Sequence, residues 1–383
     1  MARRNGGFVG QDGLDAPDPP TGVAASGVAT SLSVSFTAPT DTGTSAITGF
    51  RAQAGSVGTS GTSSPLSITG LTVGTSYDVS VWAINAYGYS APSDAVSASP
   101  AAARGLWFGG ETNTAINVIQ FVTISTLGDA ADFGDLSETV TASAAFASSS
   151  RGLRAGGTGS NVIEFITIAS AGNATDFGDL SAATDIAAGS SSKTRGLVSG
   201  GRGPVNTIDY VTIASAGNSS DFGNLSVARA FVGGHSSPTR SITGGGDTGS
   251  NSNVIDYVTI SSVGNSTDFG NLTVARYGGA GASSETRGLF MGGAANAQSN
   301  VIDYITIASA GNATDFGNLT LARTTYGGGC SSSTRAIVGG GSGLSNIIEH
   351  VTIANTGNAS DFGDLLSATK EICSASNDHG GLQ

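Results

Sequence analysis

The chain has 383 residues, of which 59 are glycine and only 11% are charged, and its formal net charge is −12. This acidic balance argues against nucleic acids and anionic membranes as partners, because both are bound through basic patches. No apolar run approaches the roughly 18 residues of a membrane-spanning helix, and Val, Ile, Leu, Phe and Tyr recur too regularly for low-complexity disorder.

Residues 1–17 come before any strand pattern. The segment "MARRNGGFVG" contains two arginines but no apolar stretch, so we expect no secretory signal here.

Residues 18–100 alternate apolar and polar side chains in short runs separated by Gly and Pro turns. The most specific stretch is "LTVGTSYDVSVWAINAYGYSAPS" at residues 71–93. It resembles a fibronectin type III domain, a β-sandwich. The resemblance implies that Tyr77 is the tyrosine-corner residue, and that Phe36 fills the core position where this family usually has Trp. Residues 99–103 then form a short linker.

Residues 101–383 contain six copies of one pattern, spaced 44 to 47 residues apart. An Asp-Phe-Gly element begins at Asp132, Asp176, Asp221, Asp268, Asp315 and Asp361. An arginine opens the segment before each Gly-Gly pair, at Arg104, Arg151, Arg195, Arg240, Arg287 and Arg335. The copies cover about 104–150, 151–194, 195–239, 240–286, 287–334 and 335–383.

Each copy is predicted to form four short strands. In the fifth copy these are the small-residue segment before Arg287, then "RGLFMGG", "NVIDYITIA" and "ATDFGNLT". Four-stranded units of about 40–50 residues, repeated four to eight times, are typical of a β-propeller. The first copy begins at its second strand, whereas the C-terminal "KEICSASND" has the length of a first strand. We therefore expect the C-terminus to close a six-bladed ring; an open β-solenoid is the alternative.

The repeat resembles the kelch propeller repeat. The features that carry this resemblance are the double Gly ending the second strand and the acidic-aromatic pair in the third, such as Asp303-Tyr304. Kelch repeats usually have Trp in the fourth strand, where this chain has Phe. The predicted fold class is therefore all-β: a fibronectin type III-like sandwich followed by a six-bladed kelch-like propeller closed by a C-terminal strand.

The Asp-Phe-Gly element is predicted to be structural. In a protein kinase these residues bind magnesium, but they need a His-Arg-Asp loop and a strand lysine, and this chain has neither. An active site is also not expected in six copies. We hypothesise that each Asp caps the turn into the fourth strand or pairs with an arginine across blades, and that each Phe packs between blades. Replacing Asp315 with Ala is then expected to lower the melting temperature.

We expect no catalytic residue, cofactor or bound metal, although two weak candidates exist. Cys330 and Cys373 are expected to be separate thiols rather than a disulfide, and the three histidines form no zinc pattern. The Asn-x-Ser/Thr sites lie in a repeated turn and are interpreted as turn chemistry. The turns "GNATDFGD" are a weaker candidate for calcium, and carboxylates at a propeller mouth are a candidate for glycoside hydrolysis.

The loops between the second and third strands differ most among the copies. "GGETNTAINVI" and "GGAANAQSNVI" are two examples, rich in Asn, Ser, Thr and Gly. Such loops suit hydrogen bonding to sugars or to a protein partner, and they are equally typical of solvated loops.

The chain as a whole resembles structural proteins of tailed bacteriophages, notably those of marine cyanobacterial phages. The motifs that carry the resemblance are "RRNGGF"-like and "APTDTGTSAITGF"-like segments and "VIDYVTIASTGNATDFGDL"-like repeats. The resemblance implies a tail fibre, tail appendage or capsid decoration on the exposed surface of the virion. It also implies docking on other virion proteins through the N-terminal segment, with Arg3, Arg4 and Phe8 as candidate residues.

In this interpretation the propeller faces outward and binds a host-surface glycan or protein. Any homo-oligomer would have to form without a coiled coil, because the chain has no heptad pattern. The alternatives are a bacterial cell-surface adhesin or lectin and, less favoured, a propeller glycosidase.

Overall fold

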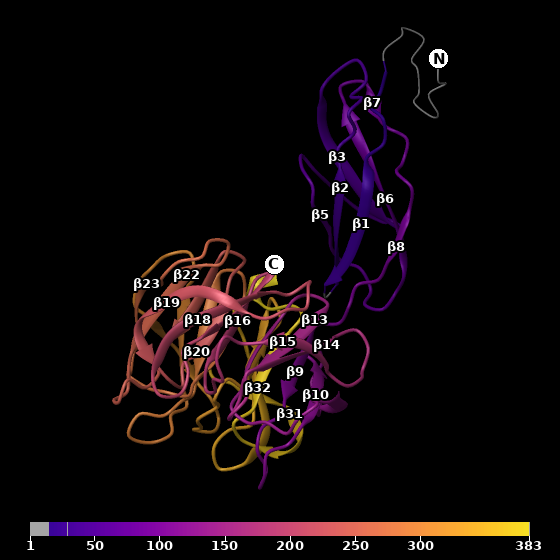
Figure 1. Cartoon of the computed structure of the whole chain (residues 1–383). Helices are drawn as coiled ribbons and strands as arrows, with labels where there is room; N and C mark the ends of the chain where they lie inside the picture. The colour runs from indigo at the N-terminus through magenta and orange to yellow at the C-terminus, as the bar shows by residue number, and fades with distance from the viewer. Residues whose placement is uncertain (1–14, 29, 383) are drawn as a thin grey trace. The chain divides into compact units, whose positions relative to one another are not determined.

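The computed structural model describes residues 15–28 and 30–382, which divide into two compact units between Ala102 and Ala103 (Figure 1). The regular structure of these residues is β throughout, apart from one turn of 3-10 helix, η1 (Gly380–Leu382). The described residues contain no helix long and apolar enough to cross a membrane. The predicted all-β class is confirmed.

Unit 1 contains two antiparallel sheets around one core. The order of one sheet is β1-β2-β5, and that of the other is β4-β3-β6-β7 with β8 also paired to β6. The strands are β1 (Thr21–Val28), β2 (Ser31–Thr37), β3 (Ile47–Ala54), β4 (Val57–Gly61), β5 (Leu66–Ile68), β6 (Tyr77–Asn85), β7 (Gly88–Tyr89) and β8 (Val96–Ala98).

The core of unit 1 follows the alternation seen in the sequence. Val79, Val81 and Ala83 on β6 are fully buried, because every second residue of a strand points to the same face. Phe36 is buried against Phe50, with ring centroids 4.8 Å apart, so it fills the core as predicted.

The tyrosine corner of unit 1 is also present. The Tyr77 hydroxyl accepts a hydrogen bond from the backbone N–H of Thr72 at 3.0 Å, across the turn that leads into β6. The role predicted for Tyr77 is confirmed.

Unit 2 contains six four-stranded antiparallel sheets among its described residues, 103–382. Sheet 1 consists of β32 (Cys373–Ser376), β9 (Arg104–Phe108), β10 (Val118–Thr123) and β11 (Ala131–Asp135). Sheet 2 consists of β12 (Ala144–Ala147), β13 (Arg151–Ala155), β14 (Val162–Thr167) and β15 (Thr175–Asp179). Sheet 3 consists of β16 (Ala188–Ser191), β17 (Arg195–Ser199), β18 (Val205–Thr212) and β19 (Ser220–Arg229).

The other three sheets repeat this order. Sheet 4 consists of β20 (Gly233–Ser236), β21 (Arg240–Gly244), β22 (Val254–Thr259) and β23 (Thr267–Asn271). Sheet 5 consists of β24 (Ala280–Ser283), β25 (Arg287–Met291), β26 (Val301–Thr306) and β27 (Thr314–Asn318). Sheet 6 consists of β28 (Gly329–Ser331), β29 (Arg335–Gly339), β30 (Ser345–Thr352) and β31 (Ser360–Thr369).

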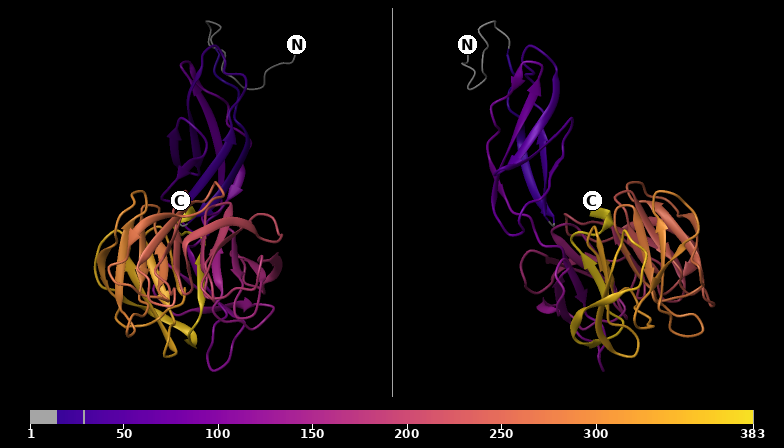
Figure 2. Two further views of the ribbon diagram at one scale, coloured as in Figure 1. Left: turned by 60° about the vertical axis from the view of Figure 1, so that its left-hand side comes forward. Right: turned by 180° about the vertical axis from the view of Figure 1, so that it is seen from behind.

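The first strands of the six sheets lie side by side in a closed series. From β12 to β28 each first strand contacts the next, and β32 contacts both β28 and β12, so the series returns to its start. Figure 2 shows two further views of unit 2, in which the C-terminal end of the chain is yellow. The C-terminal segment does supply a strand to the first sheet, since β32 pairs with β9 from Cys373 opposite Phe108 to Ser376 opposite Gly105.

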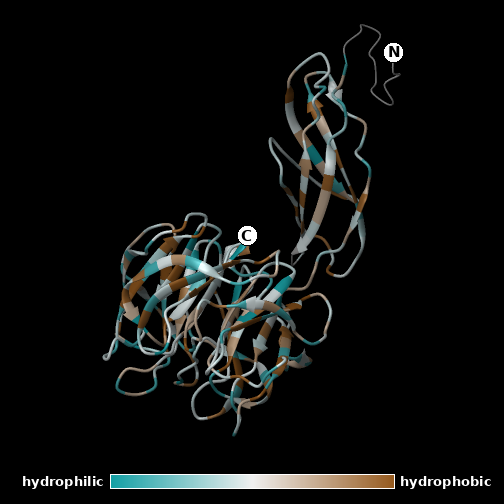
Figure 3. Cartoon of the chain, in the orientation of Figure 1, coloured by the Kyte–Doolittle hydropathy of each residue, from teal (hydrophilic) through white to brown (hydrophobic). Residues whose placement is uncertain are grey.

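Small side chains allow the first strands to approach one another closely. A Cβ atom added at Gly189 on β16 would lie 2.0 Å from the Ala145 carbonyl oxygen on β12. The closed series of first strands surrounds the axis of unit 2. Farther from this axis both faces of each sheet are covered, so hydrophobic residues, brown in Figure 3, recur along the strands of unit 2. On β26, for example, Ile302 and Ile305 point to opposite faces and both are buried.

The Asp-Phe-Gly element forms the junction between neighbouring sheets. The loop after the third strand of one sheet donates two backbone hydrogen bonds to the fourth strand of the preceding sheet. Gly172 N–H donates to the Phe133 carbonyl at 2.7 Å, and Ala174 N–H donates to the Asp135 carbonyl at 2.8 Å. The Asn173 side-chain oxygen accepts from Asp135 N–H at 3.1 Å. We call this set of three bonds the loop latch.

The loop latch is present at all six junctions. The donors to the Phe carbonyl oxygens at the other five are Gly217, Gly264, Gly311, Gly357 and Gly128. Gly128 joins sheet 1 to Phe362 of sheet 6, which closes the series. The glycine of each element is required at this junction: it has a positive φ, and a Cβ atom on Gly134 would lie 2.4 Å from the Gly172 carbonyl oxygen.

The three residues of the element therefore have different positions. Each Phe is buried, with an exposure of about 2%, and packs edge-on against an aromatic side chain of its own sheet, as Phe316 does against Tyr304 at 6.0 Å. Each of the six Asp side chains is exposed. In the described part of the chain no ion pair joins these carboxylates to the repeated arginines, so the predicted Asp–Arg pairing is wrong.

Substitutions in one element test this division of roles. Gly317→Ala should lower the free energy of unfolding of unit 2 by about 1–3 kcal/mol or more. Ala is strained at a φ of +147°, and its Cβ would lie 2.3 Å from the Gly357 carbonyl oxygen. Asp315→Ala, as the matched control, should change the free energy of unfolding by less than about 0.5 kcal/mol. Urea unfolding of both variants gives the two values. Equal losses would contradict the assignment.

Removing the closing strand should have a larger effect. A chain that ends at residue 370 lacks β32, so β9 becomes an uncovered edge strand. We expect this chain to oligomerise through that edge or to lose its cooperative unfolding transition. Size-exclusion chromatography with light scattering and a thermal melt would show either result, and a stable monomer with the wild-type melting temperature would contradict the closure.

Candidate functional site

The repeated arginines connect neighbouring sheets. Arg287, at the start of β25, donates from Nη1 to the Ile353 carbonyl of sheet 6 at 2.9 Å, and its guanidinium lies over the Tyr304 ring at 4.4 Å. The equivalent hydrogen bonds from Arg104, Arg151, Arg195, Arg240 and Arg335 reach Ile168, Ile213, Ile260, Ile307 and Ile124. Half-buried carbonyl oxygens therefore stabilise the charge in place of the predicted carboxylate, and at five of these arginines a ring face does so as well.

One polar residue on each third strand also binds the preceding sheet. This position is buried, and its side-chain oxygen accepts a hydrogen bond from a backbone N–H at the end of the preceding fourth strand. Asp303, for example, accepts from Thr273 N–H at 3.1 Å. The six residues are Gln120, Glu164, Asp209, Asp256, Asp303 and Glu349. These residues have a structural role, and all but Asp209 and Gln120 face a buried arginine.

Three of the buried arginines come from the end of the preceding fourth strand. Arg229 lies 2.6 Å from Asp256, Arg276 lies 3.1 Å from Asp303, and Arg323 pairs with Glu349, with at most 2% of any of these side chains exposed. Burial lowers the pKa of each arginine and the facing carboxylate opposes that change. Removing one partner would leave a buried charge, which costs far more than a surface ion pair contributes.

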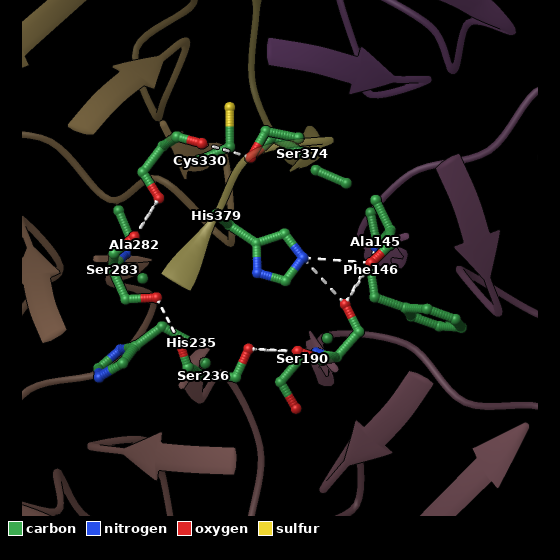
Figure 4. Close-up of a pocket in the computed structure, with 18 of the residues that line it drawn as sticks. Ala145, Phe146, Ser190, His235, Ser236, Ala282, Ser283, Cys330, Ser374 and His379 are labelled. Atoms are coloured by element: carbon green, nitrogen blue, oxygen red, sulfur yellow. Dashed lines mark hydrogen bonds between the residues drawn. The ribbon is translucent and has the colours of Figure 1, made fainter. Parts of the chain in front are cut away.

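The axis of unit 2 contains two small cavities between the first strands. Their volumes are about 40 and 30 Å³, room for a few water molecules but not for a sugar ring. Around the larger one, the Ser191, Ser236, Ser283 and Ser331 hydroxyls each donate to the carbonyl of the preceding first strand at 2.7 Å. Figure 4 shows His379, which follows the closing strand, in the middle of this ring.

His379 closes this end of the axis. Its Nε2 lies 3.2 Å from the Ala147 carbonyl oxygen and 3.1 Å from the Ser191 hydroxyl. Burial lowers the pKa of His379 to about 4, and that of His235, which packs against Phe290, to about 3. Both histidines are therefore neutral at pH 7.

The two cysteines are separate buried thiols, as predicted. Burial raises the pKa of Cys330 and of Cys373 to about 12, so neither is a thiolate nucleophile at neutral pH. Within residues 15–28 and 30–382, no group of three or more His, Cys, Asp or Glu side chains is arranged to hold a metal ion.

The other end of the axis has a ring of residues in the left-handed backbone conformation. One such residue lies two or three positions before the first strand of each sheet: Ala142, Ile186, Phe231, Gly278, Tyr326 and Glu371, with φ between 51° and 65°. Their N–H groups donate from sheet to sheet, for example Phe231 to the Ile186 carbonyl and Gly278 to the Phe231 carbonyl. We call these residues the left-handed ring. Non-glycine residues in this conformation are strained, and such strain clusters at functional sites.

Aromatic side chains gather on the left-handed ring. The Phe231 ring lies 5.4 Å from that of Tyr277 and 5.7 Å from that of Tyr326, and all three are half-buried. Glu371 lies close enough to Tyr326 to help raise its pKa, although burial is the larger cause. We call Phe231, Tyr277 and Tyr326 the aromatic cluster. Half-buried Phe and Tyr side chains offer a ligand both an apolar face and a hydroxyl.

Sequence reasoning missed the aromatic cluster. A signal was present, because three neighbouring copies carry an aromatic residue one to three positions after the arginine at 229, 276 or 323. The segments differ in sequence there, so only the fold shows that the three rings meet at one end of the axis. Trp107, the one tryptophan of the repeats, is fully buried, and its Nε1 donates to the Gly328 carbonyl at 3.0 Å.

Two other sets of residues were singled out in the sequence, the Asn-x-Ser/Thr asparagines and the candidate docking residues. Asn173, Asn312 and Asn358 accept backbone hydrogen bonds within the loop latches, which agrees with their interpretation as turn residues. The candidate docking residues Arg3, Arg4 and Phe8 lie outside the described residues.

His379 should make stability depend on pH. Its folded pKa, about 4, is below the unfolded value of 6.5, so between these values the unfolded chain binds more protons and stability falls as the pH falls. We expect His379→Gln to lose less stability than the wild type when the pH is lowered from about 6.5 to about 4. Urea unfolding at several pH values would show this, and identical pH slopes would contradict it.

Comparison with known proteins identifies one part of the chain. No curated protein matches the sequence. Residues 18–99 match the family model of the fibronectin type III domain, in agreement with the two sheets and the tyrosine corner of unit 1. Unit 1 therefore contains a fibronectin type III domain.

Proposed function

We propose that unit 2 is a six-bladed β-propeller of the kelch-like kind, with each four-stranded sheet as one blade. The closed series of first strands and the pairing of β32 with β9 support this. The repeated latches support it further, since an open array would leave one fourth strand without its loop.

The chain is proposed to be a non-enzymatic surface protein of a phage virion, either a tail fibre or appendage or a capsid decoration. The support for this assignment is the resemblance of its N-terminal, fibronectin-like and repeat motifs to tailed-phage structural proteins. In this proposal the N-terminal segment, 1–17, docks on other virion proteins and the propeller is displayed to the host.

The left-handed ring is the observation that carries a binding function. Its backbone is the same in every sheet, yet its six side chains are all different: Ala, Ile, Phe, Gly, Tyr and Glu. Positions that only hold the six sheets together, such as the Asp-Phe-Gly elements, are identical in all six copies. Variation on a constant frame is what a specific binding surface requires.

The chemistry of this end of the axis suits a glycan on the host surface. The aromatic cluster supplies half-buried rings, and the neighbouring loops between second and third strands are exposed and polar, as at Asn113 and Ser250. Most of the buried carboxylates of unit 2 already bind backbone N–H groups and arginines, which supports binding rather than hydrolysis.

The virion assignment can be tested by immunogold electron microscopy. Antibody against unit 2 is applied to purified phage particles from the source and to intact host cells. Label at fixed positions on particles is the expected result and distinguishes tail from capsid. Label on cells alone would contradict the assignment and favour a cell-surface adhesin.

The binding surface can be tested independently of the virion. Phe231→Ala and Tyr326→Ala should each weaken binding to host-envelope polysaccharide by about tenfold or more, the loss expected at a central aromatic contact. Tyr89→Ala is the matched control, because Tyr89 is an exposed aromatic residue of unit 1. Biolayer interferometry on immobilised polysaccharide gives the affinities. Wild-type affinity in both unit 2 variants would exclude the aromatic cluster as the site.

A further inference from the structure

At one junction between sheets, a buried carboxylate has no buried arginine beside it. At three other junctions, an arginine at or shortly after the end of the fourth strand pairs with the acid of the next sheet. Between sheets 1 and 2, Val140 takes the arginine's place, and Arg154 of β13 pairs with Glu164 instead. Between sheets 6 and 1, the two positions hold Thr369 and Gln120, which are both neutral. Arg154 also lies 3.0 Å from Glu138, whose side chain is 39% exposed. At these five junctions, therefore, the buried charges balance.

The junction between sheets 2 and 3 is different. Thr184 stands at the arginine position, but the facing residue is still an acid, Asp209, with only 6% of its surface exposed. Its Oδ2 accepts hydrogen bonds from Ser181 N–H at 2.9 Å, from the Ser181 hydroxyl at 2.7 Å and from the Ser219 hydroxyl at 2.9 Å. Its Oδ1 is buried and accepts no hydrogen bond from any described residue.

A cavity of about 100 Å³ lies against this carboxylate. Its lining includes Asp209, Thr184, Gly200 and Thr207. It reaches the surface, because Ser181 and other lining residues at its rim are exposed. On the same measure one water molecule needs about 10–15 Å³, so the cavity has room for a small planar cation.

The lining repeats the atoms that hold an arginine at the next junction. There, Arg229 donates to the Gly245 carbonyl at 2.9 Å, to the Val254 carbonyl at 2.5 Å and to Asp256 at 2.6 Å. The residues at these positions in sheet 3 are Gly200, Thr207 and Asp209. Two carbonyl groups and a carboxylate at this spacing match the planar donors of a guanidinium group.

We propose that this cavity is a binding site for the guanidinium group of a ligand, such as an arginine side chain. Arg202 is the nearest cation of the lining, and it pairs through Nε with Asp185 Oδ2 at 2.7 Å. That pair is neutral, so Asp209 leaves the site with one net negative charge. The site binds the ligand in the way that the neighbouring junction binds Arg229.

The experiment is an NMR titration of the full-length 15N-labelled protein with methylguanidinium chloride. The amide of Ser181 donates to Asp209 and reports on the site, whereas the amide of Ser226 donates to Asp256 beside Arg229 and is the internal control. We expect a saturable shift of the Ser181 resonance and none at Ser226. Sodium chloride at equal ionic strength should not reproduce it. No saturable shift, or equal shifts at both amides, would overturn the proposal.

Three variants identify the binding group. Asp209→Asn and Thr184→Arg should both lose the response, and Thr184→Arg should also raise the melting temperature by about 2–4 °C, because its own guanidinium enters the site. Arg202→Ala should keep the response. Binding to Arg202→Ala but not to the wild type would show that Arg202 occupies the cavity, and would overturn the proposal.

A second arm of the titration distinguishes free small cations from arginine side chains. A short peptide with blocked ends and a single central arginine should shift the same Ser181 resonance if the site receives a side chain from a partner. The same peptide with citrulline in place of arginine has the same length but no charge and should not. Equal shifts with both peptides would overturn the guanidinium assignment.

Discussion

The backbone hydrogen bonds of the loop latch are the interaction on which the rest of unit 2 depends. Every four-stranded sheet has an outer strand whose N–H and C=O groups would otherwise face solvent and recruit another chain. The loop of the following sheet covers that edge, with bonds such as Gly172 to Phe133 and Ala174 to Asp135. Each bond contributes only about 0.5–1.5 kcal/mol, but its repetition at six junctions fixes every sheet against its neighbours.

This constraint explains why some residues are identical in all copies and others are free to differ. A glycine is needed wherever two backbones meet, and a buried Phe is needed beneath each latch. The left-handed ring and the loops between second and third strands lie away from these contacts. Their side chains can vary without affecting the frame, so ligand specificity is expected there. The junction at Asp209 is the opposite case, because a buried acid there faces Thr184 where the next three copies have an arginine.

The sequence predicted most of the frame because repetition and strand patterns are local signals. The spacing of the copies and the offset at Arg104 were enough to predict that the C-terminal segment supplies a strand to the first sheet, and Tyr77 was enough to predict its corner. The partners across junctions could not be predicted, because they depend on which atoms two sheets bring together. The arginines were therefore paired with exposed Asp residues instead of with carbonyl oxygens, and the aromatic cluster around Phe231 was missed.

Amide hydrogen exchange at the latch glycines would test the closed frame most directly. If the six sheets form one closed cooperative unit, the amides of Gly128, Gly172, Gly217, Gly264, Gly311 and Gly357 should all exchange only through global unfolding of unit 2, with similar protection. The decisive amide is Gly128, which joins sheet 1 to sheet 6. Exchange at Gly128 that is orders of magnitude faster than at the other five would show that the series opens at that junction, and would contradict the account.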